Sequence, residues 1–277
     1  MTARGNAKGR IARDEDDFRT LLATLAQAVE RHGWLCHAYC LVGNHFHLLV
    51  ETPEPNLSHG MAYLNSLYAQ RFNRRDGRVG HVFQGRFHAV LLEREAHLME
   101  LSRYVVLNPV RAGMCTAPGE WPWSSYQATT GEVPRPVFLT VDWLLEQFGT
   151  ETAQAREEYR RFIAASSPAR PWDDLRGQIY LGTESFIAEH VPIRANPREI
   201  ARAQREPLRP SLAKILGTAA SGSRLLEARS HGYRLREIGE HLGVHHVTVR
   251  RRLRRLERPQ HCSILRPDPD SGAGVRS

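Results

Sequence analysis

Lysine is almost missing from this chain. Of 38 basic residues only Lys8 and Lys214 are lysine, and the others are arginine. Acidic residues number 30, which leaves a formal net charge of +8 at pH 7. Arginine binds phosphate through a planar fork of donors, although codon usage accounts equally well for the choice of arginine over lysine. The positive sum itself favours a polyanionic partner.

Long apolar runs and cysteines are also scarce. No segment approaches the ~20 consecutive apolar residues of a membrane span, and residues 1–10 lack the apolar core of a secretory signal. Four cysteines are too few for a disulfide framework in 277 residues. We therefore expect a cytoplasmic protein with no membrane partner.

Apolar periodicity predicts an α+β fold in the first part of the chain. Gly43-Asn44 marks a two-residue turn between two strands, and Pro109 is expected to stop the third helix. We expect three helices to cover one face of a small antiparallel sheet. The predicted helices span 14–33, 58–75 and 95–108, and the predicted strands span 34–42, 45–50 and 82–92.

Composition predicts the domain organisation of the remaining chain. Residues 1–130 form the expected α+β domain, and 131–210 read as a connector with helical stretches at 141–148 and 151–165. Residues 211–258 are basic and helical. Residues 259–277 are rich in Pro, Asp, Ser and Gly, which is typical of a disordered tail.

Two histidines on one predicted strand are the first candidate site. His45 and His47 alternate along the strand and so share a face, opposite Phe46 and Leu48. Two neutral imidazoles after a tight turn can bind one divalent cation. The alternative is two histidines on the solvated face of a half-buried strand, and spacing alone favours that alternative.

A polar stripe on the third predicted helix offers a partner for the histidines. Glu100, Tyr104 and Asn108 recur at four-residue steps, so they line one side of the helix. Asn108 offers an amide oxygen to a metal, and the phenol of Tyr104 can attack phosphorus beside a cation. Taken alone, a half-exposed tyrosine and a helix-capping asparagine explain these two residues equally simply.

Four sequence blocks resemble one family of DNA-processing enzymes. Residues 44–49, Asn-His-Phe-His-Leu-Leu, resemble the His-hydrophobic-His core of the HUH nucleases. Residues 104–113, Tyr-Val-Val-Leu-Asn-Pro-Val-Arg-Ala-Gly, resemble the tyrosine segment of single-tyrosine HUH transposases. Residues 70–87, from Gln-Arg-Phe-Asn to Phe-Gln-Gly-Arg-Phe, and 121–126, Trp-Pro-Trp-Ser-Ser-Tyr, are similar to two further blocks of that group. The most similar subgroup is the REP-associated tyrosine transposases, in their longer form.

This resemblance implies a metal-dependent endonuclease and strand transferase that acts on single-stranded or hairpin DNA. It implies an HUH-type, ferredoxin-like antiparallel sheet with helices packed on it. His45, His47 and Asn108 would bind Mg²⁺ or Mn²⁺, and Tyr104 would form a 5′-phosphotyrosine. Family members occur as monomers and as homodimers, so the resemblance implies one of these two states.

Other side chains receive predictions of their own. Tyr68, a rival nucleophile, lies in an apolar stripe and is expected in the core. Cys36 and Cys40 are expected to share one face of a strand as packed thiols. Phe83, Phe87 or Tyr39 could stack on a base. Four arginines flank the expected site and are candidates for binding the DNA backbone, as readily as for a solvated basic face: Arg71, Arg74, Arg75 and Arg86.

The basic C-terminal region resembles the helix-turn-helix of the replication initiator DnaA. Residues 235–253 read as helix, glycine turn and helix, with Ile238, Leu242, Val244, Val249 and Leu253 packed between the helices. The second helix would present polar residues to duplex DNA. The alternative is a basic hairpin packed on the catalytic domain. The candidate DNA-binding residues are His245, His246, Thr248, Arg250, Arg251 and Arg252.

Two other functions fit the same residues. One is a DNA-binding regulator with an inactive nuclease scaffold, and the other is an RNA-processing nuclease. The chain departs from the family at its start, where residues 1–6 begin inside the strand that opens the family's sheet. We therefore expect either a start downstream of the natural one or a lost edge strand, and reduced activity.

Overall fold

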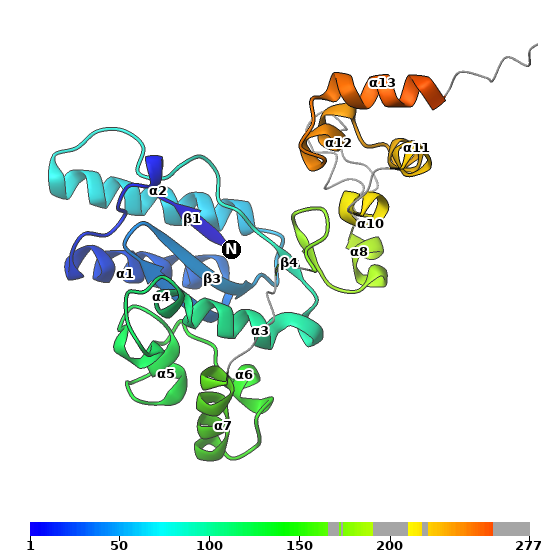
Figure 1. The fold of residues 1–277 in the computed structure, drawn as a ribbon. Helices are drawn as coiled ribbons and strands as arrows, with labels where there is room; N and C mark the ends of the chain where they lie inside the picture. The colour runs from blue at the N-terminus through cyan, green and yellow to red at the C-terminus, as the bar shows by residue number, and fades with distance from the viewer. Residues whose placement is uncertain (166–171, 173, 191–209, 218–220, 257–277) are drawn as a thin grey trace, which may run out of the picture. The chain divides into compact units, whose positions relative to one another are not determined.

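The computed structural model describes residues 1–165, 172, 174–190, 210–217 and 221–256, with the backbone alone at 94–96 and 255–256 (Figure 1). These residues fall into two compact units, residues 1–208 and 209–277. The predicted tail at 259–277 and most of the second half of the connector lie outside the described residues. Each unit is described by itself.

A three-stranded antiparallel sheet forms the centre of the first unit. Its strands are β1 (Thr2–Arg4), β2 (Leu35–Val42) and β3 (His45–Glu51), in the order β1-β3-β2. The predicted turn at Gly43-Asn44 joins β2 to β3. The opening strand is present, although short, because Thr2–Arg4 pairs with β3. The prediction of a small antiparallel sheet within a mixed helix and sheet fold is confirmed.

Helices cover both faces of the sheet, which corrects the expectation that three helices share one face. Helices α1 (Glu15–His32) and α2 (Leu57–Asp76) pack on one face, where Phe46 and Leu48 are buried. Helix α3 (Arg94–Val106) crosses the other face (Figure 1). Its predicted apolar stripe packs there on β2 and β3, in a cluster that contains Leu98, Leu101, Val105, Ala38, Cys40, Val42 and Leu49.

A bulge in β2 corrects the prediction for the two strand cysteines. The pairing of β2 with β3 shifts by one residue between Cys36 and Ala38, so His37 is inserted. Because side chains alternate with a period of two, one extra residue moves all that follow to the opposite face. Cys36 therefore packs with α1 and α2, whereas Cys40 packs with α3. Both thiols are fully buried, as predicted.

The predicted strand at 82–92 is largely wrong. The segment touches β1 through two isolated bridges, Gly5 to Phe83 and Thr2 to His88. Between the two bridges this segment advances by five residues, from Phe83 to His88, whereas the opposite stretch of the chain advances by three, from Thr2 to Gly5. A regular antiparallel ladder therefore cannot form between them. Gly85, at φ 66°, supplies the left-handed backbone that this mismatch requires. Only β4 (Leu91–Leu92) is a strand, and it pairs in parallel with β5 (Tyr180–Leu181).

Helix α3 ends at Val106, slightly before the predicted Asn108. A short helix, α4 (Asn108–Arg111), follows at once with Pro109 in its first turn, where a missing N–H costs nothing. The other elements among the described residues of the first unit are η1 (Asn6–Lys8), η2 (Pro118–Glu120), α5 (Tyr126–Thr130), α6 (Asp142–Glu146), α7 (Thr152–Ala164) and α8 (Glu184–His190).

The second unit consists of short helices around its own apolar core. Ile238, Val249 and Leu253 are buried in it, and Leu242 and Val244 pack against it, as predicted. Its helices are α10 (Leu212–Leu216), α11 (Gly222–Ser230), α12 (Leu235–His241) and α13 (His246–Leu256). In the parts of the chain that the structure describes, no helix is both long and apolar enough to span a membrane.

Candidate functional site

His45 and His47 lie side by side on the face of the sheet that α3 crosses. Their ring centroids are 4.9 Å apart with the planes nearly perpendicular. Directly opposed residues of an antiparallel pair share a face. Strand β1 therefore places Arg4 beside His45 and Thr2 beside His47 on this surface.

The contacts of His45 with two amide oxygens indicate which ring nitrogen is available to bind a metal. Its Nδ1 donates to the Oδ1 of Asn44 over 2.6 Å, and its Nε2 lies 3.3 Å from the Oδ1 of Asn108. A neutral imidazole donates from one nitrogen only, so a donating Nδ1 leaves a lone pair on Nε2. Burial lowers the pKa of His45, an effect that the contact with Asn108 opposes and the charge of Arg4 supports. The neutral ring thus directs a lone pair toward an amide oxygen.

His47 has a buried nitrogen that finds no partner among the residues that the structure describes. Within those residues its Nε2 is shielded from solvent and makes no hydrogen bond. Burial, then the neighbouring His45 and the chain's amino group, lowers the pKa of His47 to about 3. His47 is therefore neutral at pH 7, and its unpaired nitrogen suits a ligand that accepts a lone pair.

These donors fit a divalent cation. Two neutral imidazoles and the amide oxygen of Asn108, which is 9% exposed, offer a mixed nitrogen and oxygen ligand set. Within the described ranges no cluster of three or more His, Cys, Asp or Glu side chains could hold a metal. A cation at this site would therefore depend on Asn108 and on water for its oxygen ligands.

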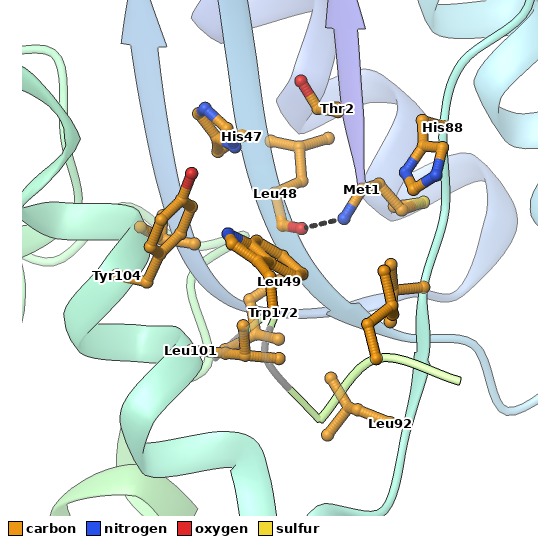
Figure 2. A pocket seen from close by; sticks show the side chains of 13 residues that line it. Met1, Thr2, His47, Leu48, Leu49, His88, Leu92, Leu101, Tyr104 and Trp172 are labelled. Atoms are coloured by element: carbon orange, nitrogen blue, oxygen red, sulfur yellow. Dashed lines mark hydrogen bonds between the residues drawn. The ribbon is translucent and has the colours of Figure 1, made fainter. Parts of the chain in front are cut away.

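Tyr104 of α3 faces the histidine pair. Its ring centroid lies 5.7 Å from that of His47, at 83°. The guanidinium carbon of Arg111 lies 4.8 Å from the centre of the Tyr104 ring. In Figure 2 the hydroxyl of Tyr104 points to the end of the pocket that carries His47. The helix and the strand thus bring a phenol and two imidazoles to one small region.

A pocket of about 230 Å³ opens beside Tyr104 (Figure 2). Trp172 lines it and meets Tyr104 edge to face, with ring centroids 5.0 Å apart. The remaining lining residues are Met1, Thr2, His47, Leu48, Leu49, His88, Val90, Leu92, Leu101, Val105 and Leu175.

Tyr68 is a core residue, as its stripe predicts. It is fully buried, and its hydroxyl donates to the backbone carbonyl of Ile11. Burial is the main cause that raises the pKa of Tyr68, followed by the charge of Asp17. A nucleophile needs access and an ionisable phenol, so Tyr68 is a poor candidate for that role.

The four arginines predicted to flank the site take different positions. Arg71 donates to Thr24 and Gln27 of α1. Arg75 pairs with Asp14 over 2.5 Å and Asp17 over 2.7 Å. Both therefore link α2 to α1 on the face opposite the histidines. Arg74 and Arg86 are exposed.

The aromatic residues suggested for base stacking also lie on the opposite face. Tyr39 is 3% exposed, and Phe83 packs on Phe46 at 5.9 Å between centroids. Phe87 packs against the same core cluster. The structure does not bring these three rings to His45 and His47.

The C-terminal candidates form an exposed surface on the second unit. All six side chains are exposed on or beside α13, whereas Val249 and Leu253 of the same helix face the core. Gly239 permits the close approach of the two helices, because an added Cβ would lie 2.6 Å from the carbonyl oxygen of Val244. The six are His245, His246, Thr248, Arg250, Arg251 and Arg252.

Sequence reasoning missed three residues that lie beside His45 or Tyr104. Arg111 belongs to the same sequence block as Tyr104, but it lies beyond the end of α3, so helical spacing does not indicate it. Arg4 could have been found from the register of β1, had the pairing been known. No local pattern marks Trp172, because a long-range fold brings it to the pocket.

Comparisons with known proteins find a family match, a curated relative and a solved structure. Residues 6–108 match the family described as "Transposase IS200 like". A protein of Haemophilus influenzae named "Putative REP-associated tyrosine transposase" is 28% identical over 111 residues, which cover 36% of this chain and 63% of that protein. A solved structure of a REP-associated tyrosine transposase bound to a REP hairpin overlaps at 16% identity with a TM-score of 0.39, covering 51% of this chain and 83% of that chain. The resemblance noted in the sequence is confirmed.

Proposed function

We propose that the chain cleaves and rejoins single-stranded or hairpin DNA through Tyr104, and the proposal starts from the match of residues 6–108 to the family described as "Transposase IS200 like". The observation that carries the proposal is the 5.7 Å separation between the rings of Tyr104 and His47 on one face of the sheet. A nucleophile and a pair of metal-binding nitrogens there can meet one phosphodiester.

Tyr104 would carry the bond-forming step of the reaction. The Oη of Tyr104 attacks the scissile phosphorus, the new bond joins Oη to phosphorus, and the bond to the 3′ oxygen breaks. The phenol proton passes to solvent, and the departing 3′ oxygen takes up a proton. The product is a 5′-phosphotyrosine and a free 3′-hydroxyl, and the reverse reaction with another 3′-hydroxyl joins strands. Because the phosphotyrosine retains the ester linkage, joining needs no external energy source.

His45, His47 and Asn108 would hold Mg²⁺ or Mn²⁺. A divalent cation there supplies charge stabilisation to the phosphoryl oxygens during attack. Asn44 supports this site, since it accepts from the Nδ1 of His45 and orients Nε2 toward Asn108. The unpaired Nε2 of His47 is the observation on this chain that favours a metal over a purely structural pair.

Covalent capture tests the proposal directly. A DNA hairpin with single-stranded flanks, labelled on the side that retains the 5′-phosphate, should become attached to the protein in Mn²⁺. Attachment should be lost with Tyr104→Phe and with chelation, while Tyr68→Phe should retain it. A Tyr104→Phe variant that cleaves at the wild-type rate would refute the assignment.

We further propose that α12 and α13 form a helix-turn-helix that binds duplex DNA. The exposed basic surface of α13 and the close crossing at Gly239 support this role. Replacing Arg251 by Ala should weaken duplex binding and lower its salt-dependence exponent by roughly one. Arg236→Ala is the matched control, because the guanidinium of Arg236 is paired with Glu240 at 3.0 Å.

We also propose a fold type, a cellular location and an oligomeric state for the chain. A ferredoxin-like order is supported by the sequence of elements β1, α1, β2, β3 and α2, followed by the extended segment at 82–92. A DNA substrate agrees with a cytoplasmic, nucleoid-associated protein, acting as a monomer or a homodimer.

An RNA-processing nuclease would use the same donors, and matched DNA and RNA hairpins in the capture assay distinguish the two substrates. A regulator with an inactive scaffold would bind duplex DNA without forming an adduct.

A further inference from the structure

The pocket beside Tyr104 has a wall that comes from outside the transposase match. Trp172 and Leu175 line it, whereas the match ends at residue 108. We propose that this pocket receives a nucleobase next to the scissile phosphate, with Trp172 as its stacking surface. The proposal rests on the proposed function, because it names what the same site does with its substrate.

The pocket lies directly beside the expected nucleophile. The ring of Tyr104 lines the pocket while its hydroxyl points to the end that carries His47 (Figure 2). A phosphodiester in line with that hydroxyl therefore has its neighbouring nucleotide at the mouth of the pocket. In a single strand such a base is free to leave the stack at small cost.

The walls of the pocket are mostly apolar. Leucine, valine and tryptophan side chains make up most of the wall, with Thr2 and His88 as polar groups on one side. Among the described residues no Asp, Glu, Lys or Arg side chain lines the pocket, and the amino group of Met1 donates to the carbonyl of Leu48 over 2.7 Å. Such walls suit the flat apolar faces of a base and do not suit a phosphate.

The chain segment that carries Trp172 and Leu175 is held in place by the residues that follow it. Strand β5 pairs with β4, and Leu181 is fully buried in the cluster under α3. The Glu93 carboxylate accepts from the Thr183 N–H at 2.7 Å and from its hydroxyl at 3.1 Å. The residues after Trp172 are thus held on the catalytic face by a strand pair, a buried leucine and two hydrogen bonds.

Trp172 is the side chain that the pocket offers for stacking. It is 38% exposed, although it contacts Tyr104 edge to face. Part of the indole therefore remains open to a ligand. Stacking on an aromatic ring accepts any base, because every base has a flat π-face, so Trp172 would position the strand with little sequence preference. Thr2 and His88 would supply whatever discrimination the pocket has.

Base-analogue fluorescence tests the proposal without cleavage. In a Tyr104→Phe background, 2-aminopurine is placed at each flanking position of a DNA hairpin in turn and excited outside the tryptophan band. At one position we expect at least a twofold change in fluorescence on binding. The change should vanish with Trp172→Ala and persist with Trp172→Phe, which keeps a flat ring. Far-UV circular dichroism checks that each variant is folded.

Two results overturn the proposal. One is a strand that binds but shows no Trp172-dependent change at any position, and the other is no binding of single-stranded flanks at all. Adduct formation in the wild type separates this failure from that of the proposed function. An adduct without a base signal removes the nucleobase pocket only, whereas a base signal without an adduct removes the nuclease and leaves the pocket.

Discussion

Tyr104 and His47 approach each other across the interface between α3 and β3, with ring centroids 5.7 Å apart and planes at 83°. The helix and the strand bury leucines and valines between them, so the polar pair lies at the margin of an apolar contact. That margin excludes part of the solvent and keeps His47 neutral. The packing of α3 on β3 therefore positions the phenol of Tyr104 and also keeps the imidazole of His47 in its neutral form.

Asn44 should control metal affinity through His45. Replacing Asn44 by Ala removes the acceptor that holds Nδ1–H at 2.6 Å, so the ring can turn or change tautomer. We expect Mn²⁺ affinity to fall by about 10–100-fold in calorimetric titration. Asn44→Asp keeps an acceptor at this position and should bind nearly as the wild type does. Equal affinity in Asn44→Ala would argue against His45 as a ligand.

Arg111 should assist the reaction through its contact with the Tyr104 ring. The guanidinium carbon is 4.8 Å from the ring centre, a cation–π geometry worth about 0.5–1 kcal/mol at an exposed site. Arg111→Met should therefore slow single-turnover adduct formation by about 2–5-fold. Arg111→Lys should lie between the variant and the wild type. No change in rate with Arg111→Met would show that the contact is incidental.

Tyr68 should affect stability and not chemistry. Tyr68→Phe leaves the buried carbonyl of Ile11 without its donor, which costs about 1–3 kcal/mol of unfolding free energy. Urea denaturation measures this loss. The adduct should still form, with Tyr104→Phe as the contrasting variant that folds but forms none. Loss of the adduct in a folded Tyr68→Phe protein would reopen the choice of nucleophile.

Arg75 should act in stability, and its effect should depend on pH. Hydrogen bonds from Arg75 hold the pKa of Asp14 well below its usual range. The unfolded chain therefore takes up a proton near pH 4 before the folded chain does, and this stabilisation is lost as pH falls below that value.

Arg75→Met should lower the thermal midpoint at pH 7 and flatten the decline toward acid. Binding of single-stranded DNA should hardly change, because Arg75 faces away from the histidines. Arg74→Met, at the exposed neighbouring position, is the control for stability. A large loss of DNA binding in Arg75→Met would support the backbone-contact role suggested by the sequence.

Local patterns predicted much of the fold. Helix α1 follows its apolar spacing, with Asp14 capping its start and Gly33 in a left-handed conformation at its end. The β2–β3 hairpin follows from its turn and from strand alternation. Alternation also predicted that His45 and His47 share a face. The four-residue step predicted that Tyr104 and Asn108 lie near each other, although Asn108 begins α4 and is not part of α3.

The errors occurred where the structure depends on non-local pairing. The bulge at His37 is invisible to a period-two reading of β2, so Cys36 was placed on the wrong face. The face that α3 covers depends on which strand residues remain uncovered by α1 and α2. Trp172 reaches the pocket through the pairing of β5 with β4, which no spacing within the sequence predicts.

The bulge also couples the two sides of the sheet. Residues before it contribute to the core under α1 and α2, and Ala38 and Cys40 after it contribute to the core under α3. Deleting one residue from this stretch would exchange those partners along the rest of β2, burying side chains in a layer of the wrong shape. A chain that keeps Tyr104 beside the two histidines is therefore not expected to tolerate a one-residue change in the length of β2, whereas loops tolerate changes in length at small entropic cost.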